Sequence, residues 1–233
     1  AGLLRDAGMT EEHRLTLERG FFSNPRSARL AIQLASAFHL AGRVAEATAQ
    51  YEKAAALAAQ YEPDSLDDTF YLGRAECARD AGQRPEAAAG FRKAIDKLPI
   101  GKPERAVPAY CGLAMLWLED GVKVEEAREL VRLAAALKKD DPAVADVLGL
   151  YAAQKGDWET ALKEYLRAEK DLPRPSTAFI LRLATALEHT GRKDEAIARL
   201  EKAAALPNAS AELRSRLDSL RGTAPKVQPP PPP

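Results

Sequence analysis

The sequence predicts an all-α protein built from repeated antiparallel helix pairs, and three observations lead to that prediction. Alanine makes up roughly a fifth of the chain, with 46% hydrophobic and only 6% aromatic residues, a composition that favours packed helices over β-sheet. Five glycines recur at steps of 40, 39, 35 and 35 residues, namely Gly42, Gly82, Gly121, Gly156 and Gly191. Small and bulky residues then recur at fixed offsets from each glycine, as repeated structural units require.

The residues that follow each glycine show the pattern most clearly. Five residues after the glycine come Ala47, Ala87, Ala161 and Ala196, and nine residues after it come Tyr51, Phe91, Tyr165 and Leu200. Gly121 fits the same pattern with one inserted residue, which brings Ala127 and Val131 into place. Helical spacing puts these positions on one stripe, and glycine readily ends a helix in the left-handed conformation. Each segment is therefore predicted to form a helix, a turn at glycine and a second helix. Such a pair must stack on its neighbours to bury both faces.

The best-matched segment carries a family resemblance. Its residues Leu148, Gly149, Gly156, Ala161, Tyr165, Ala168 and Pro173 resemble the tetratricopeptide repeat (TPR), in a bacterial type, and the other segments follow the pattern with lapses. The resemblance covers nearly the whole chain. It implies a right-handed superhelical solenoid of antiparallel helix pairs, with a concave groove that holds protein partners. The first two glycine steps exceed the usual repeat of ~34 residues, so extra turns or longer helices are expected near 60–68 and 100–106.

The pattern divides the chain into a series of units. Residues 1–27 are expected to be a degenerate or truncated first repeat that turns at Gly8, which would make the chain a fragment or a processed form. Arg74 and Ala78 replace bulky apolar residues, so the second full repeat is expected to have the weakest core. Five TPR-like repeats are expected at 28–61, 68–100, 107–141, 142–174 and 177–209, followed by a capping helix at 210–221 and a disordered Pro-rich tail at 222–233. The tail is either a linker or a ligand for proline-binding domains.

The chain carries little that indicates chemistry. Its 34 basic and 34 acidic residues cancel, which argues against a general nucleic-acid binder, and no apolar run is long enough to span a bilayer. Cys77 and Cys111 form neither a disulfide framework nor a metal cluster, and Cys77 is expected to be a buried small residue. His13, His39 and His189 lack metal-ligand spacing, and no glycine-rich phosphate loop is present. We therefore expect no enzyme activity, no cofactor and no metal.

The resemblance also implies where a partner would bind. Positions 13, 10, 6, 3 and 2 before each turn glycine should line the concave groove. The candidate partner-binding residues at these positions are Ile32, Leu72, Glu76, Arg79, Cys111, Met115, Leu118, Leu150 and Leu181. The apolar middle of this set favours an apolar or amphipathic partner segment. Two alternatives remain, because neighbouring repeats could cover the strip or the face could be misassigned by one residue.

The lysine, asparagine and arginine clamp that holds chaperone tails in related proteins is absent. Its positions carry Ile32, Ser36, Gly73, Pro108 and Gly112. The predicted function is a non-catalytic scaffold or adaptor that binds a protein segment. The alternative is a TPR module of a larger protein, in bacterial envelope export, pilus or secretion assembly or as the targeting domain of a transferase. Terminal repeats could also self-associate. The compartment stays open between cytoplasm and bacterial periplasm or envelope.

Overall fold

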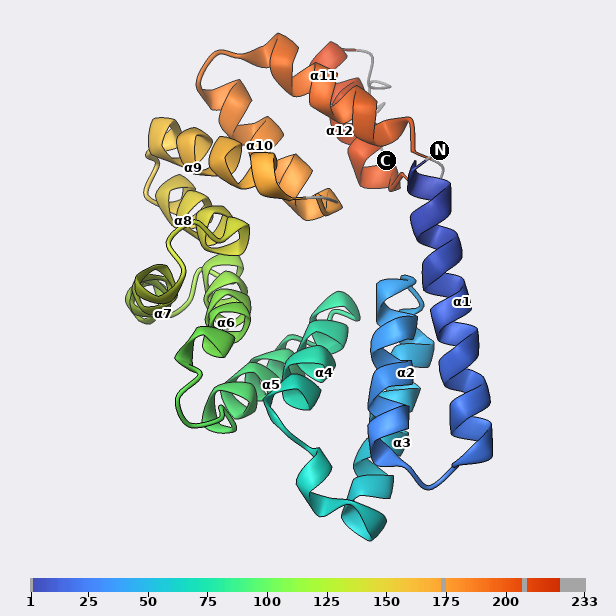
Figure 1. Ribbon diagram of the computed structural model, residues 1–233. Helices are drawn as coiled ribbons and strands as arrows, with labels where there is room; N and C mark the ends of the chain where they lie inside the picture. The colour runs from blue at the N-terminus through green and yellow to red at the C-terminus, as the bar shows by residue number, and fades with distance from the viewer. Residues whose placement is uncertain (1, 173–174, 207–208, 223–233) are drawn as a thin grey trace, which may run out of the picture. The chain divides into compact units, whose positions relative to one another are not determined.

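The computed structural model describes residues 2–172, 175–206 and 209–222, with side chains from residue 11 onward. All regular structure in these ranges is helical (Figure 1), so the all-α prediction is confirmed. The α-helices are α1 (Gly2–Ser23), α2 (Ala28–Leu40), α3 (Val44–Tyr61), α4 (Asp68–Asp80), α5 (Arg84–Asp96), α6 (Val107–Glu119), α7 (Val124–Leu137), α8 (Pro142–Gln154), α9 (Trp158–Asp171), α10 (Thr177–His189), α11 (Lys193–Ala204) and α12 (Ala211–Arg221). Two 3₁₀ turns, η1 (Pro63–Ser65) and η2 (Pro103–Ala106), precede α4 and α6.

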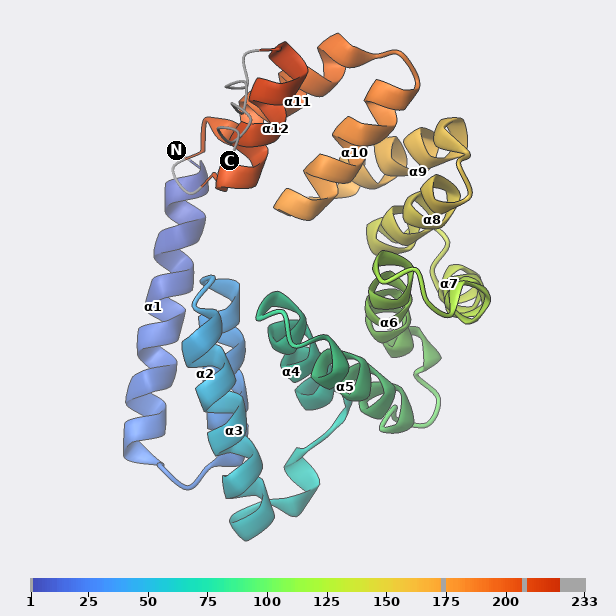
Figure 2. The same cartoon turned by 180° about the vertical axis from the view of Figure 1, so that it is seen from behind.

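Consecutive helices from α2 to α11 form antiparallel pairs. We call α2, α4, α6, α8 and α10 the first helices and their partners the second helices (Figures 1 and 2). Each pair turns at a predicted glycine, with φ between 65° and 77°. At Gly156, for example, the Asp157 N–H donates to the Ala152 carbonyl over 3.0 Å. That bond closes the end of α8 around a left-handed residue, a conformation that costs glycine little.

The N-terminal segment differs from expectation, because α1 runs unbroken from Gly2 to Ser23. The turn expected at Gly8 does not form, and this part of the prediction is wrong. A single glycine inside a helix costs only about 1 kcal/mol, and the residues after it are helix formers. Arg14 forms ion pairs with Glu11 and Glu18, one turn away on either side. Segment 1–27 therefore supplies one helix, which contacts α2.

The extra residues in the first two intervals between turn glycines adopt two different structures. Helix α3 has 18 residues and continues to Tyr61, and η1 then leads into α4. The second insertion forms the connection 97–102 and η2. Pro63 and Pro103 each begin a 3₁₀ turn. Proline lacks a backbone N–H, and at the first position of a helical turn that N–H would have no partner within the turn. The Arg105 side chain holds η2 to α4 through a 2.8 Å bond to buried Asp68.

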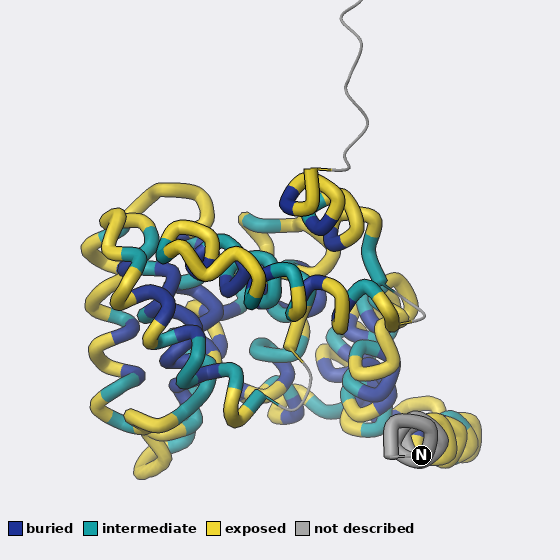
Figure 3. The backbone as a smooth tube through the Cα atoms, turned by 90° about the horizontal axis from the view of Figure 1, so that it is seen from above, coloured by how far each residue is buried: buried dark blue, intermediate teal, exposed yellow. Residues whose placement is uncertain are grey.

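The chain divides into two compact units, residues 1–138 and 139–233. Unit 1 contains α1–α7. Unit 2 contains α8–α12 and has an apolar core that includes Leu213, Leu217 and Leu220 of α12. Buried and exposed stretches alternate along the backbone of individual helices (Figure 3), as expected of helices that pack on one side. The predicted Pro-rich tail lies outside the described residues except for Gly222, which caps α12.

Within both units, an aromatic ring of a second helix lies directly over a glycine of a first helix. The pairs are Tyr51 with Gly73, Phe91 with Gly112, and Tyr165 with Gly149. A Cβ atom on Gly112 would lie 2.5 Å from two ring atoms of Phe91. The sequence pattern predicts the close approach at Gly149. It does not predict the close approach of the aromatic rings to Gly73 and Gly112.

The second full repeat contains a hollow where a weak core was expected. It measures about 330 Å³ and lies among α3, α4 and α5. Arg74, Ala78 and Gly90 contribute to its lining. These residues supply little apolar volume, and Arg74 is exposed. The absence of a bulky apolar side chain from positions 74 and 78 thus leaves a space in unit 1.

Substitution of Gly112 by alanine is expected to lower the free energy of unfolding by about 1–3 kcal/mol, because the new methyl group clashes with the fully buried Phe91 ring. Urea unfolding followed by circular dichroism measures this change. Gly20→Ala is the matched control, since its Cβ would come no closer than 3.9 Å to the Leu30 Cδ2 atom. It should stabilise the helix by about 0.5–1 kcal/mol. Shifts of the same sign in both variants would contradict the packing described.

Ala78→Leu is expected to raise the free energy of unfolding by about 0.5–2 kcal/mol, because the larger side chain fills the hollow. Ala87→Leu makes the same change at a fully buried position that does not line the hollow, and overpacking there should cost about 1–3 kcal/mol. Thermal melting of the two variants distinguishes these effects. A loss of stability in both would show that the space at Ala78 cannot accept a leucine.

Candidate functional site

The candidate site in unit 1 is the face formed by its first helices. Helix α2 contacts α4, and α4 contacts α6. The partly exposed residues among those predicted to bind a partner are Ile32 on α2, Leu72, Glu76 and Arg79 on α4, and Met115 on α6. We call this set the first-helix face. Its members are neither core nor fully solvated, so a partner could cover their remaining apolar area.

Three of the predicted residues do not belong to an accessible surface. Leu118 is fully buried, Cys111 is 3% exposed and Leu150 is 9% exposed. Helix α6 buries residues on more than one side, and Cys111 and Leu118 are among them. These two positions are covered within the molecule, which is one of the alternatives left open by the sequence, whereas Met115, between them on the same stripe, is partly exposed. The apolar strip is therefore narrower than expected, with Met115 as the accessible residue of α6 among those predicted.

A hollow lies at the N-terminal ends of α2 and α4. It has a volume of about 330 Å³, and its lining includes Arg29 and Ile32 on α2, Asp64 and Ser65 on η1, and Thr69 on α4. Arg29, Ile32 and Thr69 occupy positions that the repeat pattern assigns to the groove. The acidic Asp64 of η1 was not predicted, because it belongs to an insertion that the repeat pattern does not describe. The hollow thus combines an apolar side chain with charges of both signs.

The opposite ends of α2 and α4 are joined by polar contacts. The Nε2 atom of His39 lies 2.9 Å from an Asp80 carboxylate oxygen, and the Arg79 Nε donates to the other oxygen over 3.3 Å. Burial acts to raise the pKa of Asp80, but the contacts with His39 and Arg79 hold it below its ordinary value. Asp80 is therefore ionised at neutral pH and joins neighbouring repeats at the edge of the first-helix face.

Glu76 has the opposite electrostatic setting. Burial raises the pKa of its carboxyl above the ordinary value, since loss of water disfavours the charged form. The charges of Arg79 and His39 oppose this shift, and Asp80 adds to it. The centre of the face thus carries a carboxylate that is costly to keep ionised.

In unit 2, Leu181 lies at a hollow between α10 and α12. The hollow measures about 410 Å³, and Thr185 of α10 and Glu212 and Arg216 of α12 also line it. Arg216 forms an ion pair with Glu188. Leu181 and Thr185 are groove positions of the last repeat. The capping helix therefore forms one wall beside the predicted residue.

The described residues provide no arrangement that suggests catalysis. No group of three or more His, Cys, Asp or Glu among them could hold a metal ion. Cys77 and Cys111 are both buried, and burial raises the pKa of Cys77 to about 11. The ring of His189 stacks on Trp158 with 3.8 Å between centroids. In the same ranges, no helix has the length and apolar character needed to cross a membrane.

Glu76→Gln is expected to stabilise the protein at pH 7, because it removes a carboxylate whose ionised form is disfavoured by burial. The folded state binds the proton more tightly than the unfolded state does, so the wild type recovers stability as the pH falls through the raised pKa towards 4.5. The advantage of the variant should shrink over that range. Urea unfolding at pH 7 and pH 5 measures it, with exposed Glu52→Gln as the control. An advantage that is equal at both pH values would contradict the assignment.

Comparison with known proteins agrees with this geometry. The family model described as "Tetratrico peptide repeat" matches residues 5–99. No curated protein sequence matches the chain.

Solved structures share the fold over most of the chain. A chain of the Cut9–Hcn1 hetero-tetramer of the APC/C superposes with a TM-score of 0.72 and 19% identity, over 94% of this chain and 40% of that one. The present chain thus spans less than half of that protein. TTC0263, a TPR protein of Thermus thermophilus, superposes with a TM-score of 0.60 and 19% sequence identity, over 84% of this chain and 99% of that one. PilW, a type IV pilus biogenesis factor, superposes with a TM-score of 0.62 and 14% sequence identity, over 93% of this chain and 96% of that one.

At 14–19% sequence identity, these similarities show a common fold and do not show that the proteins bind the same partner. The family match in the N-terminal part, the turns at five glycines and the stacked helix pairs of both units agree with one another. Residues 5–99 match the tetratricopeptide repeat family, and the described helix pairs of both units have the fold of TPR proteins.

Proposed function

We propose that the chain is a non-catalytic interaction module that binds a segment of a partner protein on the first-helix face of unit 1. The TPR fold generally serves protein–protein interaction. The observation that carries the proposal is the row of partly exposed apolar side chains Ile32, Leu72 and Met115 on helices that contact in series. A row of this kind offers anchor points to an extended or helical segment.

The chemistry of the face favours an amphipathic segment. Ile32, Leu72 and Met115 accept apolar side chains, and methionine adapts to irregular shapes. Arg29 and Arg79 lie on the same helices as these residues and can bond polar groups of the partner. Because a Lys, Asn and Arg clamp is absent from the positions predicted for it, the partner is expected to be held along its side chains instead of by a terminal carboxylate.

A module of a larger assembly is the second candidate. The likeness to PilW extends over almost the whole of both chains, so a role in pilus or envelope assembly is compatible with the fold. The same interaction surface would serve a scaffold, an adaptor or such a module. Co-purification from the source cell, with and without the first-helix face intact, distinguishes an assembly partner from a soluble one.

The double variant Leu72→Glu/Met115→Glu should lose at least tenfold in affinity for peptides selected on the wild-type chain, because each carboxylate places a charge where an apolar side chain docks. Phage display supplies the peptides, and fluorescence anisotropy gives the dissociation constants. Leu133→Glu is the matched control, since Leu133 is exposed on the second helix α7.

Circular dichroism must show unchanged helicity in these variants. If the double variant loses helicity, Arg79→Glu tests the same face without removing an apolar contact. Peptides that bind the double variant and the Leu133 control equally well would show that the partner docks elsewhere.

A further inference from the structure

A separate hollow in unit 2 lies between α9 and the beginning of α11, on second helices and not on the first-helix face. Its volume is about 470 Å³. Leu162 and Leu166 supply its apolar lining, and Leu162 is 4% exposed. Its polar lining consists of Lys163, Arg167, Lys170, Arg192 and the acidic Glu159. We call this the α9 groove, and four of its five charged residues are basic.

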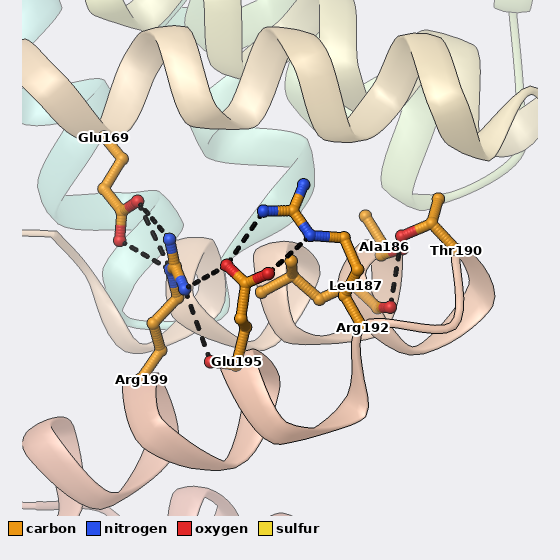
Figure 4. Close-up of polar contacts among 7 residues, drawn as sticks. All are labelled: Glu169, Ala186, Leu187, Thr190, Arg192, Glu195 and Arg199. Atoms are coloured by element: carbon orange, nitrogen blue, oxygen red, sulfur yellow. Dashed lines mark hydrogen bonds and ion pairs between the residues drawn. The ribbon is translucent and has the colours of Figure 1, made fainter.

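The arginines of the α9 groove are held by acidic neighbours. Arg192 contacts Glu195 at 2.6 Å, and Arg167 lies 2.8 Å from Glu164. Figure 4 shows how the contacts continue from Glu195 through Arg199 to Glu169 on α9, with 3.0 Å between the Arg199 Nε and a Glu169 oxygen. This series of charges joins α9 to α11, and it fixes the position of Arg192 at the rim.

The lysines are in a different situation. Lys163 and Lys170 are exposed, and within the described part of the chain neither forms an ion pair. They lie seven residues apart on α9, which corresponds to about 10 Å along the helix axis. Leu162 and Leu166 lie four residues apart on the same helix, so an apolar stripe runs beside the two uncompensated ammonium groups.

We propose that the α9 groove binds an acidic amphipathic segment of a partner protein. A leucine-sized side chain of that segment contacts Leu166, which is partly exposed beside the buried Leu162. Carboxylates spaced two helical turns apart face Lys163 and Lys170. A nucleic acid fits this lining less well, because the lining is part apolar and the chain has no net positive charge. The charge pattern is complementary to acidic groups, since Glu159 is the single acid in the lining.

The test uses the full 233-residue chain and synthetic peptides of about 16 residues, long enough to form a helix when bound. The peptides carry leucines four residues apart and glutamates seven residues apart. Fluorescence anisotropy should show saturable binding that weakens from about 0.05 to 0.3 M salt. Lys163→Glu/Lys170→Glu should raise the dissociation constant at least tenfold, since attraction becomes repulsion.

Lys97→Glu/Lys102→Glu makes the same change of net charge on exposed residues of unit 1 and should bind like the wild type. Lys163→Gln/Lys170→Gln is a milder variant that should show an intermediate loss. Equal loss in the Lys97/Lys102 control, or none in the Lys163/Lys170 variant, would overturn the proposal. So would absence of saturable binding, equal binding of a peptide with lysine in place of glutamate, or stronger competition by a single-stranded oligonucleotide.

The α9 groove and the first-helix face can be tested apart from each other. Leu72→Glu/Met115→Glu should leave binding of the acidic peptide unchanged, because these residues lie in unit 1. Loss of acidic-peptide binding in that variant would assign the peptide to the first-helix face and overturn the α9 groove proposal.

Discussion

The close approach of a ring to a backbone without a side chain holds successive helices together. Tyr51, Phe91 and Tyr165 each occupy space that a Cβ atom on the facing glycine would fill. Tyr51 and Tyr165 also meet Phe70 and Phe179 edge to face, with centroids 5.8 and 6.0 Å apart. Helices of this length are marginal alone in water, so their stability comes from such contacts between neighbours. The accessible surfaces are formed by the side chains that these contacts between helices do not bury.

This constraint explains why the candidate face is mixed in character. The apolar residues of α6 are largely used in packing, and Cys111 and Leu118 are among them. Accessible positions on the first helices therefore include Glu76, Arg79 and His39 beside Leu72 and Met115. The polar residues also connect helices, since the contact between His39 and Asp80 joins α2 to α4. A partner on this face meets a few apolar anchors between fixed charges, an arrangement that favours specificity over raw affinity.

The sequence predicts the helix pairs well because each turn depends on one local requirement. A glycine with positive φ ends the first helix, and all five predicted turns have it. Gly8 shows the limit of that argument, because the same residue inside a run of helix formers does not break the helix. The site was harder to predict. Whether Leu118 or Met115 is exposed depends on the packing of neighbouring elements. The acidic Asp64 of η1 comes from an insertion outside the repeat pattern.

The two surfaces proposed here differ in how much their charges are already satisfied. On the first-helix face, Asp80 is bound by His39 and Arg79, so a partner there must compete with contacts inside the protein. At the α9 groove, neighbouring acids hold Arg167 and Arg192, whereas Lys163 and Lys170 stand outside these pairs. An ion that is already paired gains little from a new partner, whereas an exposed ion without a partner gains up to about 1 kcal/mol from a new pair. Charge attraction should therefore contribute more to binding at the α9 groove, and apolar contact more at the first-helix face.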